Sequence, residues 1–185
     1  AIPCELEGLY SWVRTFAPEL REKITVTIGL LCGWQYSHHS INAMGEYLGF
    51  EPQDIADISY RGGGPVGKLS VTTTDGRQYS ASRRVDFGYQ VAFDRHFNTS
   101  RCHVCVNHGN FLADLVVGDA WLPSTVFTKT GISLVVCRTP FAEEILSSLV
   151  TAGSCVSVEV TEEEIRESQT DRVVFGEFAY AYASY

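Results

Sequence analysis

Two cysteines separated by two residues, Cys102 and Cys105, constrain this chain more than any other feature of its sequence. A C-x-x-C pair forms half of a thiolate metal site, forms a redox dithiol, or arises by chance. A redox dithiol is typical of a helix start that follows a strand. Polar residues flank this pair at 98–101 and 107–110 and predict a loop on both sides. The loop favours a metal-binding pair, with a chance spacing as the main alternative.

Cys32 stands at the end of a predicted strand. The β-branched, apolar run 23–31 predicts a buried strand that ends at this cysteine. Residues 37–49 then predict a helix, with Ser37 as its N-cap and Gly49 after its last turn. Cys32 would therefore lie between the carboxyl end of a strand and the head of a helix, the edge at which open α/β sheets bind ligands.

Cys4 occupies a similar position, because residues 1–4 predict the tail of a strand and residues 5–13 predict a helix. Two thiols at strand ends and a C-x-x-C loop together supply four soft ligands. The alternative is that these two cysteines are small buried residues. We expect that second role for Cys137 and Cys155.

The remaining pattern predicts α/β or mixed α+β architecture in a single domain over residues 1–185. Asp75-Gly76 between two β-rich arms is a strong signal for a hairpin. The segment 83–101 has no clear period. We expect further strands at 57–60, 112–119, 131–137 and 156–160, and further helices at 140–152 and from Thr161 onward.

A glycine-rich segment, Arg61-Gly62-Gly63-Gly64-Pro65-Val66-Gly67-Lys68, follows one of these strands. It matches neither the Rossmann fingerprint nor the Walker motif. It does supply bare backbone between two cations, and successive amide groups in such a turn bind phosphate. A nucleotide pyrophosphate site and a flexible connection are equally compatible with these residues.

Charge and hydropathy exclude two classes of partner. The chain has 14 basic and 22 acidic residues, a net charge of −8, which opposes binding to a phosphate backbone and predicts no nucleic-acid partner. No apolar run reaches the about 20 residues of a membrane-spanning helix. No signal peptide is recognisable, and unpaired thiols suit a reducing compartment, so we expect a cytoplasmic protein.

Five segments in order carry a resemblance to a known family. They are Ile2-Pro3-Cys4, Ile28-Gly29-Leu30-Leu31-Cys32, Asp57-Ile58-Ser59-Tyr60 with the glycine-rich segment, Arg101-Cys102-x-x-Cys105, and Ala113-Asp114-x-x-x-Gly118-Asp119-Ala120-Trp121-Leu122. With these segments the chain resembles the β-subunit of hydrogenases and dehydrogenases that use coenzyme F420, an 8-hydroxy-5-deazaflavin. Relatives include the 7-hydroxymethyl chlorophyll a reductases.

The resemblance implies an FAD- and iron–sulfur-dependent oxidoreductase of α/β fold that passes electrons between a [4Fe–4S] cluster and FAD. It implies Cys4, Cys32, Cys102 and Cys105 as cluster ligands. It implies an FAD site that includes Arg61, Gly62, Gly63, Gly64, Gly67 and Lys68, with Asp119 and Trp121 from the family's Gly-Asp-x-Trp motif. The implied partners are a redox protein or ferredoxin-like module, and a soluble electron carrier or small-molecule substrate. Members are longer, which implies a fragment without its N-terminal portion.

Two other functions remain open from the sequence. The same four thiolates would hold a structural zinc ion in a non-catalytic module, because a tetrahedral site of four sulfur ligands suits zinc as well as iron. The aromatic segment Phe178 to Tyr185 would alternatively recruit a partner to a docking module. The carrier or substrate itself is not identified by any residue pattern.

Overall fold

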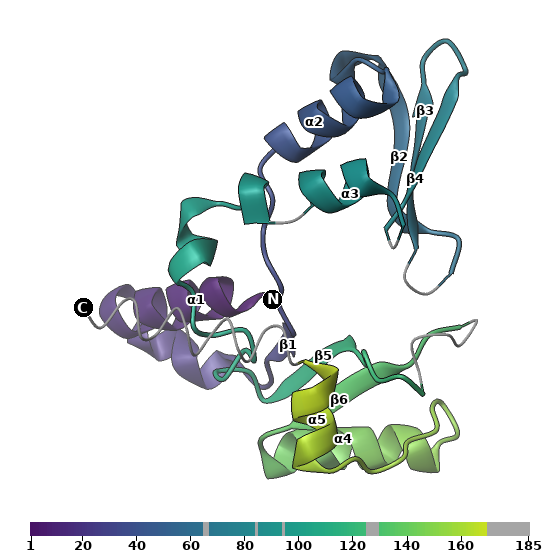
Figure 1. Cartoon of the computed structure of the whole chain (residues 1–185). Helices are drawn as coiled ribbons and strands as arrows, with labels where there is room; N and C mark the ends of the chain where they lie inside the picture. Colours follow the sequence, from purple (N-terminus) through teal and green to yellow (C-terminus); the bar gives the residue numbers. More distant parts are fainter. Residues whose placement is uncertain (65–66, 84, 94, 125–129, 170–185) are drawn as a thin grey trace. The chain divides into compact units, whose positions relative to one another are not determined.

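The computed structural model describes residues 1–64, 67–83, 85–93, 95–124 and 130–169, and these form two compact units. The first unit contains residues 1–33, 105–122 and 132–169, and the second contains residues 34–104 and 123–131, apart from the gaps just given. Each is built from its own sheet and helices (Figure 1). The prediction of one functional domain over the whole chain stays a prediction.

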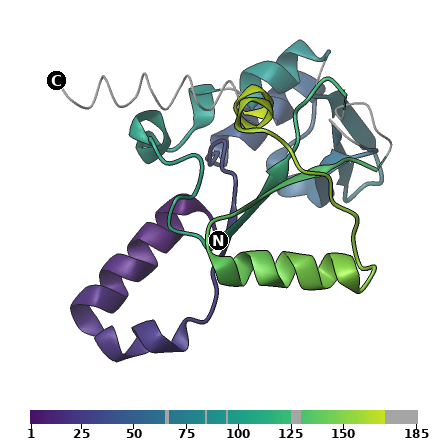
Figure 2. The same cartoon turned by 90° about the horizontal axis from the view of Figure 1, so that it is seen from below.

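A three-stranded mixed sheet forms the centre of the first unit. Its strands, in spatial order, are β1 (Ile28–Leu30), β5 (Leu115–Asp119) and β6 (Ser133–Cys137). β1 runs parallel to β5, and β5 runs antiparallel to β6. The helices of this unit are α1 (Pro3–Phe16), the 3₁₀ helix η1 (Pro18–Lys23), α4 (Pro140–Thr151) and α5 (Glu162–Ser168). Figure 2 shows α1 and η1, in purple and blue, meeting at an angle.

Helix α1 covers one face of this sheet. Leu6 of α1 is buried against Ala113 and Val116, and Tyr10 and Val136 pack against this cluster. Side chains alternate between the two faces of a strand, so Ile28 and Leu30 lie on the other face, where they are exposed. The fully buried apolar cluster of the unit is therefore small.

The second unit is an antiparallel meander with helices on one face. Its strands are β2 (Ile55–Gly62), β3 (Lys68–Thr73) and β4 (Gln78–Ser82), and its helices are α2 (His39–Leu48), α3 (Phe87–Ala92) and the 3₁₀ helices η2 (Pro52–Asp54), η3 (Arg95–Phe97) and η4 (Ser100–Val104). Helices α2 and α3 lie on the same side of the sheet (Figure 1). Met44, Tyr89 and Ala92 of these helices join Leu69, Val71 and Ala81 of the strands in one core.

Local signals placed most helix ends correctly. Gly49 ends α2 in the left-handed conformation, at φ 85°. Thr139 caps α4, and Thr161 forms a capping box with Glu164 at the start of α5. The predicted N-cap of α2 was wrong, because His38 and not Ser37 occupies that position.

Three predicted strands differ most from the structure, and the strand tail expected at 1–4 is absent because α1 begins at Pro3. The strand expected at 23–31 is reduced to Ile28–Leu30, because residues 18–23 form a 3₁₀ helix before it. The strand expected at 156–160 is not formed, and Val156 and Val158 are 95% and 84% exposed. A β-rich segment forms a strand only where a neighbouring strand accepts its hydrogen bonds. The aromatic segment 178–185 lies outside the described residues, and no helix among the described ones is long and apolar enough to cross a membrane.

Candidate functional site

Cys4 and Cys32 lie on neighbouring segments of the first unit. Cys4 belongs to the first turn of α1. The Ala1 amino group donates to the Ile28 carbonyl at 2.9 Å, and the Leu30 amide donates to the Ala1 carbonyl at 3.0 Å. This is the bonding pattern of parallel strands, so the residues before Cys4 run beside the strand that precedes Cys32. The strand expected at 1–4 is nevertheless not formed, because α1 already begins at Pro3.

The loop that begins at Cys105 is bonded to both of these segments. The Cys32 amide donates to the His108 carbonyl at 3.1 Å, and His108 Nδ1 lies 2.9 Å from the Cys32 carbonyl oxygen. Asn107 Nδ2 donates to Glu7 Oε1 of α1 at 2.8 Å. Three of the four predicted ligand cysteines therefore belong to segments that hydrogen bonds join directly.

Asn110 holds the same loop against the sheet. Its side chain is fully buried, and Nδ2 donates to the carbonyl oxygens of Ala1 at 2.9 Å and Leu30 at 3.3 Å. Its φ is 54°, in the left-handed region that asparagine tolerates better than most residues. Arg138 donates to the carbonyl oxygens of Gly109 and Asn110 at 2.8 and 3.1 Å. The sequence patterns did not single out this asparagine, although the turn-forming run Asn107-His108-Gly109-Asn110 is a usable signal.

Cys102 belongs to the second unit, within η4. The expected loop at this position is thus a short 3₁₀ helix. Cys102 Sγ accepts a hydrogen bond from the Gln35 amide at 3.3 Å and lies 3.2 Å from Thr99 Oγ1. Either atom of the Thr99–Cys102 contact could be the donor.

The chemistry of these thiols fits a soft metal or an iron–sulfur cluster. All four are half-buried, and the cysteines form no disulfide within the described residues. No group of three or more His, Cys, Asp or Glu side chains in this part of the chain is positioned to hold a metal ion. The four-ligand set therefore stays a prediction.

The other two cysteines differ from one another. Cys137 of β6 is half-buried, and burial, followed by the nearby Glu143, raises the pKa of its thiol. Cys155 is exposed, so the prediction that it is a small buried residue was wrong. It directly precedes residues 156–160, where the expected strand is not formed.

The glycine-rich segment connects β2 to β3 in the second unit. Gly63, Gly64 and Gly67 have φ values of 84°, 102° and 73°, which other residues rarely adopt. A Cβ on Gly67 would lie 2.9 Å from the Arg61 Cα, so glycine is required there for the close approach. Pro65 and Val66 lie outside the described residues.

This connection presents the features that a phosphate group requires. Gly63 and Gly64 are exposed, as are Arg61 before them and Lys68 after them. Gly62 pairs with Lys68 at the base of the connection, so the strand pairing brings the two ends together. Exposed backbone beside two cations fits the pyrophosphate of FAD.

Asp119 and Trp121 lie in the other unit, at the end of β5. The Asp119 side chain is exposed. The backbone carbonyl oxygen of Asp119 accepts a hydrogen bond from Gln169 Nε2 at 2.8 Å. The Trp121 amide donates to Ser168 Oγ at 3.0 Å. The backbone of this segment thus anchors the end of α5, and a role of either side chain toward FAD stays a prediction.

The fold and these sites define a mixed α+β chain with thiols and a glycine-rich turn at the ends of its strands. The chain belongs to the family described as the C terminus of the beta subunit of coenzyme F420 hydrogenase/dehydrogenase, whose model matches residues 1–163. This match confirms the resemblance inferred from the sequence.

A solved structure has a similar fold. It is a chain of the F420-reducing [NiFe] hydrogenase complex from Methanosarcina barkeri, with a TM-score of 0.57 and 19% sequence identity. The match covers 95% of this chain and 57% of that one, so this chain spans little more than half of its relative's length. The similarity confirms the mixed α+β fold class. A comparison with curated proteins finds no significant match.

Proposed function

We propose that this chain is a module of an FAD- and iron–sulfur-dependent oxidoreductase. It passes electrons between a [4Fe–4S] cluster and FAD, and exchanges them with a deazaflavin-type carrier or a related small-molecule substrate. Family membership and the similarity to a chain of the F420-reducing hydrogenase complex support this class of function. The partners we propose are a redox protein or ferredoxin-like module and the soluble carrier.

The observation that carries the proposal is the bonding of the loop after Cys105. This loop reaches the Cys32 segment through His108 and the Cys4 helix through Asn107. Bonding of this kind fixes the backbone from which three of the four proposed thiolates extend.

In this proposal Cys4, Cys32, Cys102 and Cys105 bind the cluster as thiolates. Such a cluster stores one electron at a potential that hydrogen bonds to its sulfur ligands tune. The Gln35 amide and the Thr99 hydroxyl beside Cys102 Sγ supply such bonds. A cytoplasmic location is part of this proposal, because free thiols persist in a reducing compartment.

Arg61, Lys68 and the amides of Gly62, Gly63, Gly64 and Gly67 bind the FAD pyrophosphate in this proposal, with Asp119 and Trp121 as further contacts. FAD supplies hydride and single-electron chemistry, which makes it the exchange point between a one-electron cluster and a two-electron carrier. The protein's part is to hold the phosphates and to orient the ring.

The first experiment replaces each of the six cysteines by serine and measures iron and acid-labile sulfide per chain after anaerobic purification. We expect Cys4→Ser, Cys32→Ser, Cys102→Ser and Cys105→Ser each to remove most of the iron. Cys137→Ser and Cys155→Ser are the matched controls and should retain it. Zinc in place of iron in the wild type would overturn the proposal in favour of a structural metal, as would iron that depends on neither Cys4 nor Cys32.

The second experiment tests the glycine-rich turn with a matched pair. Gly63 and Gly76 have nearly equal φ values of 84° and 83°. A Cβ added at Gly63 would meet only the Lys68 side chain, at 3.6 Å, and a Cβ added at Gly76 would meet nothing within 4 Å. Gly63→Val and Gly76→Val therefore cause similar backbone strain. We expect only Gly63→Val to abolish flavin binding, measured by absorbance per chain. Equal flavin content in the two folded variants would refute the assignment.

A further inference from the structure

A cavity of about 620 Å³ lies beside α1 and η1 in the first unit. Its walls are largely apolar and include Tyr10, Val13, Pro18 and Leu112, and Arg14 and Arg21 lie at its rim. Pockets that bind small molecules have volumes of about 300–1,000 Å³, mostly apolar walls and a few polar groups. Neither the predicted thiol ligands nor the glycine-rich turn lines it.

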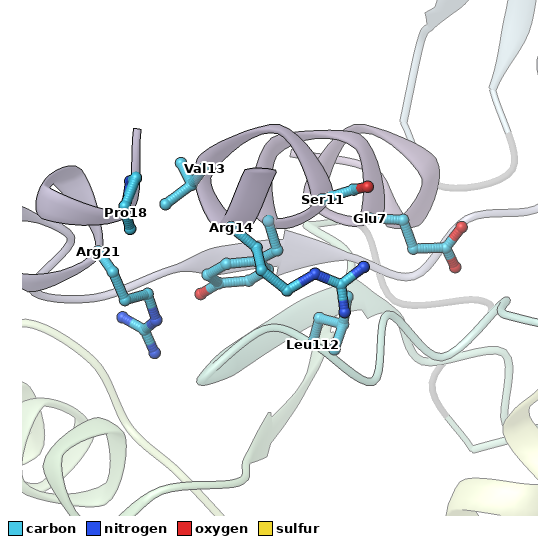
Figure 3. Close-up of a pocket in the computed structure, with 8 residues that line it drawn as sticks. Glu7, Ser11, Val13, Arg14, Pro18, Arg21 and Leu112 are labelled. Atoms are coloured by element: carbon cyan, nitrogen blue, oxygen red, sulfur yellow. The ribbon is translucent and has the colours of Figure 1, made fainter. Parts of the chain in front are cut away.

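The two arginines give this cavity a positive character. Figure 3 shows Arg14 and Arg21 directed toward the side on which Leu112 lies. The Arg21 guanidinium lies over the Tyr10 ring, 5.2 Å from its centroid, which holds the charge against the apolar wall. Neither arginine forms an ion pair with a carboxylate within the described part of the chain.

The acidic groups nearby are already bound to other residues. Glu7 lines the cavity next to Ser11, and its Oε1 accepts a hydrogen bond from Asn107. Asp114, whose carboxyl group lies within electrostatic range of Arg21, accepts from the amide and the hydroxyl of Thr27. The guanidinium groups therefore remain available to a ligand in a chain whose net charge is −8.

We propose that this cavity binds a small amphipathic organic anion, with an apolar body and a carboxylate or phosphate head. The body packs against Tyr10, Val13 and Leu112. The head lies at the rim, where a planar guanidinium donates two parallel hydrogen bonds to either kind of oxyanion. A cation is disfavoured there, because the two arginines outnumber the single lining carboxylate of Glu7.

The test uses three probes that share one ring system: 1-naphthoate, 1-naphthyl phosphate and the neutral 1-naphthylmethanol. Binding to the purified protein is measured by isothermal titration calorimetry at low salt, with and without bound cofactors. We expect at least one anion to bind with a dissociation constant below about 1 mM, and the alcohol to bind at least about tenfold more weakly. The ratio of the two anion affinities identifies the preferred head group.

Variants locate the site. Arg14→Gln and Arg21→Gln should each weaken anion binding by about three- to tenfold, and the double variant should abolish it. Lys23→Gln is the matched control, because it removes one charge from the same 3₁₀ helix at a residue outside the cavity. Ser11→Phe should block the cavity and leave the fold intact, since Ser11 is exposed.

Three results would overturn the proposal: no anion binding in the millimolar range, equal affinity for the neutral alcohol, or unchanged affinity in the double arginine variant or in Ser11→Phe. None of them bears on the proposed redox function, which depends on other residues. Loss of iron or flavin, in turn, leaves the anion site untouched.

Discussion

Asn110 offers the sharpest test of how the thiol-bearing segments are held together. Its side chain is fully buried, and its amide group donates to the carbonyl oxygens of Ala1 and Leu30. Asn110→Ala removes both donors and leaves two carbonyl oxygens with fewer partners in the interior. Each hydrogen bond contributes about 1 kcal/mol net, and the left-handed backbone costs alanine about 1 kcal/mol more. We therefore expect a loss of about 3 kcal/mol in the free energy of unfolding.

Two companion variants separate these contributions. Asn110→Gly loses the same hydrogen bonds but tolerates a φ of 54°, so it should be about 1 kcal/mol more stable than Asn110→Ala. Asn110→Asp keeps the shape and places a carboxylate against two carbonyl oxygens. Burial raises the pKa of such a carboxyl group, so its destabilisation should grow as the pH rises above about 4.

The assay is urea unfolding at pH 7, with hydrogen exchange of residues 26–31 to assign the change to the first unit. Asn42→Ala, at an exposed position of α2, is the control and should change stability by less than about 0.5 kcal/mol. Iron content measured on the same variants should fall with stability. The reasoning fails if Asn110→Gly is no more stable than Asn110→Ala, or if all three variants unfold like the wild type.

Two further perturbations probe the same unit. A Cβ on Gly29 would lie 2.4 Å from Asn110 Nδ2 and 2.7 Å from the Ala113 Cβ, so Gly29→Ala should destabilise by about 3 kcal/mol in urea unfolding. Gly8→Ala has open space around the new Cβ and should stabilise α1 by about 0.5–1 kcal/mol; equal effects of the two would refute the contact argument. Burial tends to raise the pKa of Asp114, but hydrogen bonds from the Thr27 hydroxyl and amide outweigh it and hold that pKa below its ordinary value. The ionised Asp114 carboxylate therefore stabilises the folded protein above about pH 4, the ordinary pKa of an unfolded aspartate, and this stability is lost as the pH falls through the lower pKa of the folded state. We expect the wild type to lose more stability than Asp114→Asn between about pH 5 and pH 2. Parallel pH curves for the two proteins would contradict the assignment.

Helix ends and the hairpin were predictable, because their signals act over a few residues. Each signal satisfies a local requirement of the backbone. Thr139 and Thr161 cap the starts of two helices, and Gly49 and Gly76 adopt positive φ values at a helix end and in the hairpin turn. Helix α3 was missed, although Asp86 caps it by accepting from the Tyr89 amide at 3.1 Å. Its six residues are too few to show a clear helical period.

The strand limits and the burial of single cysteines were not predictable in this way. Val156 and Val158 have strong β propensity, yet the described chain provides no neighbouring strand for them. Cys155 is exposed for the same reason. The strand-end and C-x-x-C patterns predicted the four thiol positions, and the resemblance to a family implied the same set. The bonds of Asn107, His108 and Asn110 were not predictable, because they join residues more than 70 positions apart in sequence.

The loop that ends at Asn110 combines stabilising hydrogen bonds with two local costs. Asn110 is fully buried, its Oδ1 has no hydrogen-bond partner in the described part of the chain, and its backbone is left-handed. An unpartnered buried oxygen and a left-handed backbone each cost stability, and local rules are broken most often where a site requires it. The departure lies where the Nδ2 group bonds the segments that lead to Cys4 and Cys32. The cost in stability is thus placed at the point where it fixes the positions of two proposed ligands.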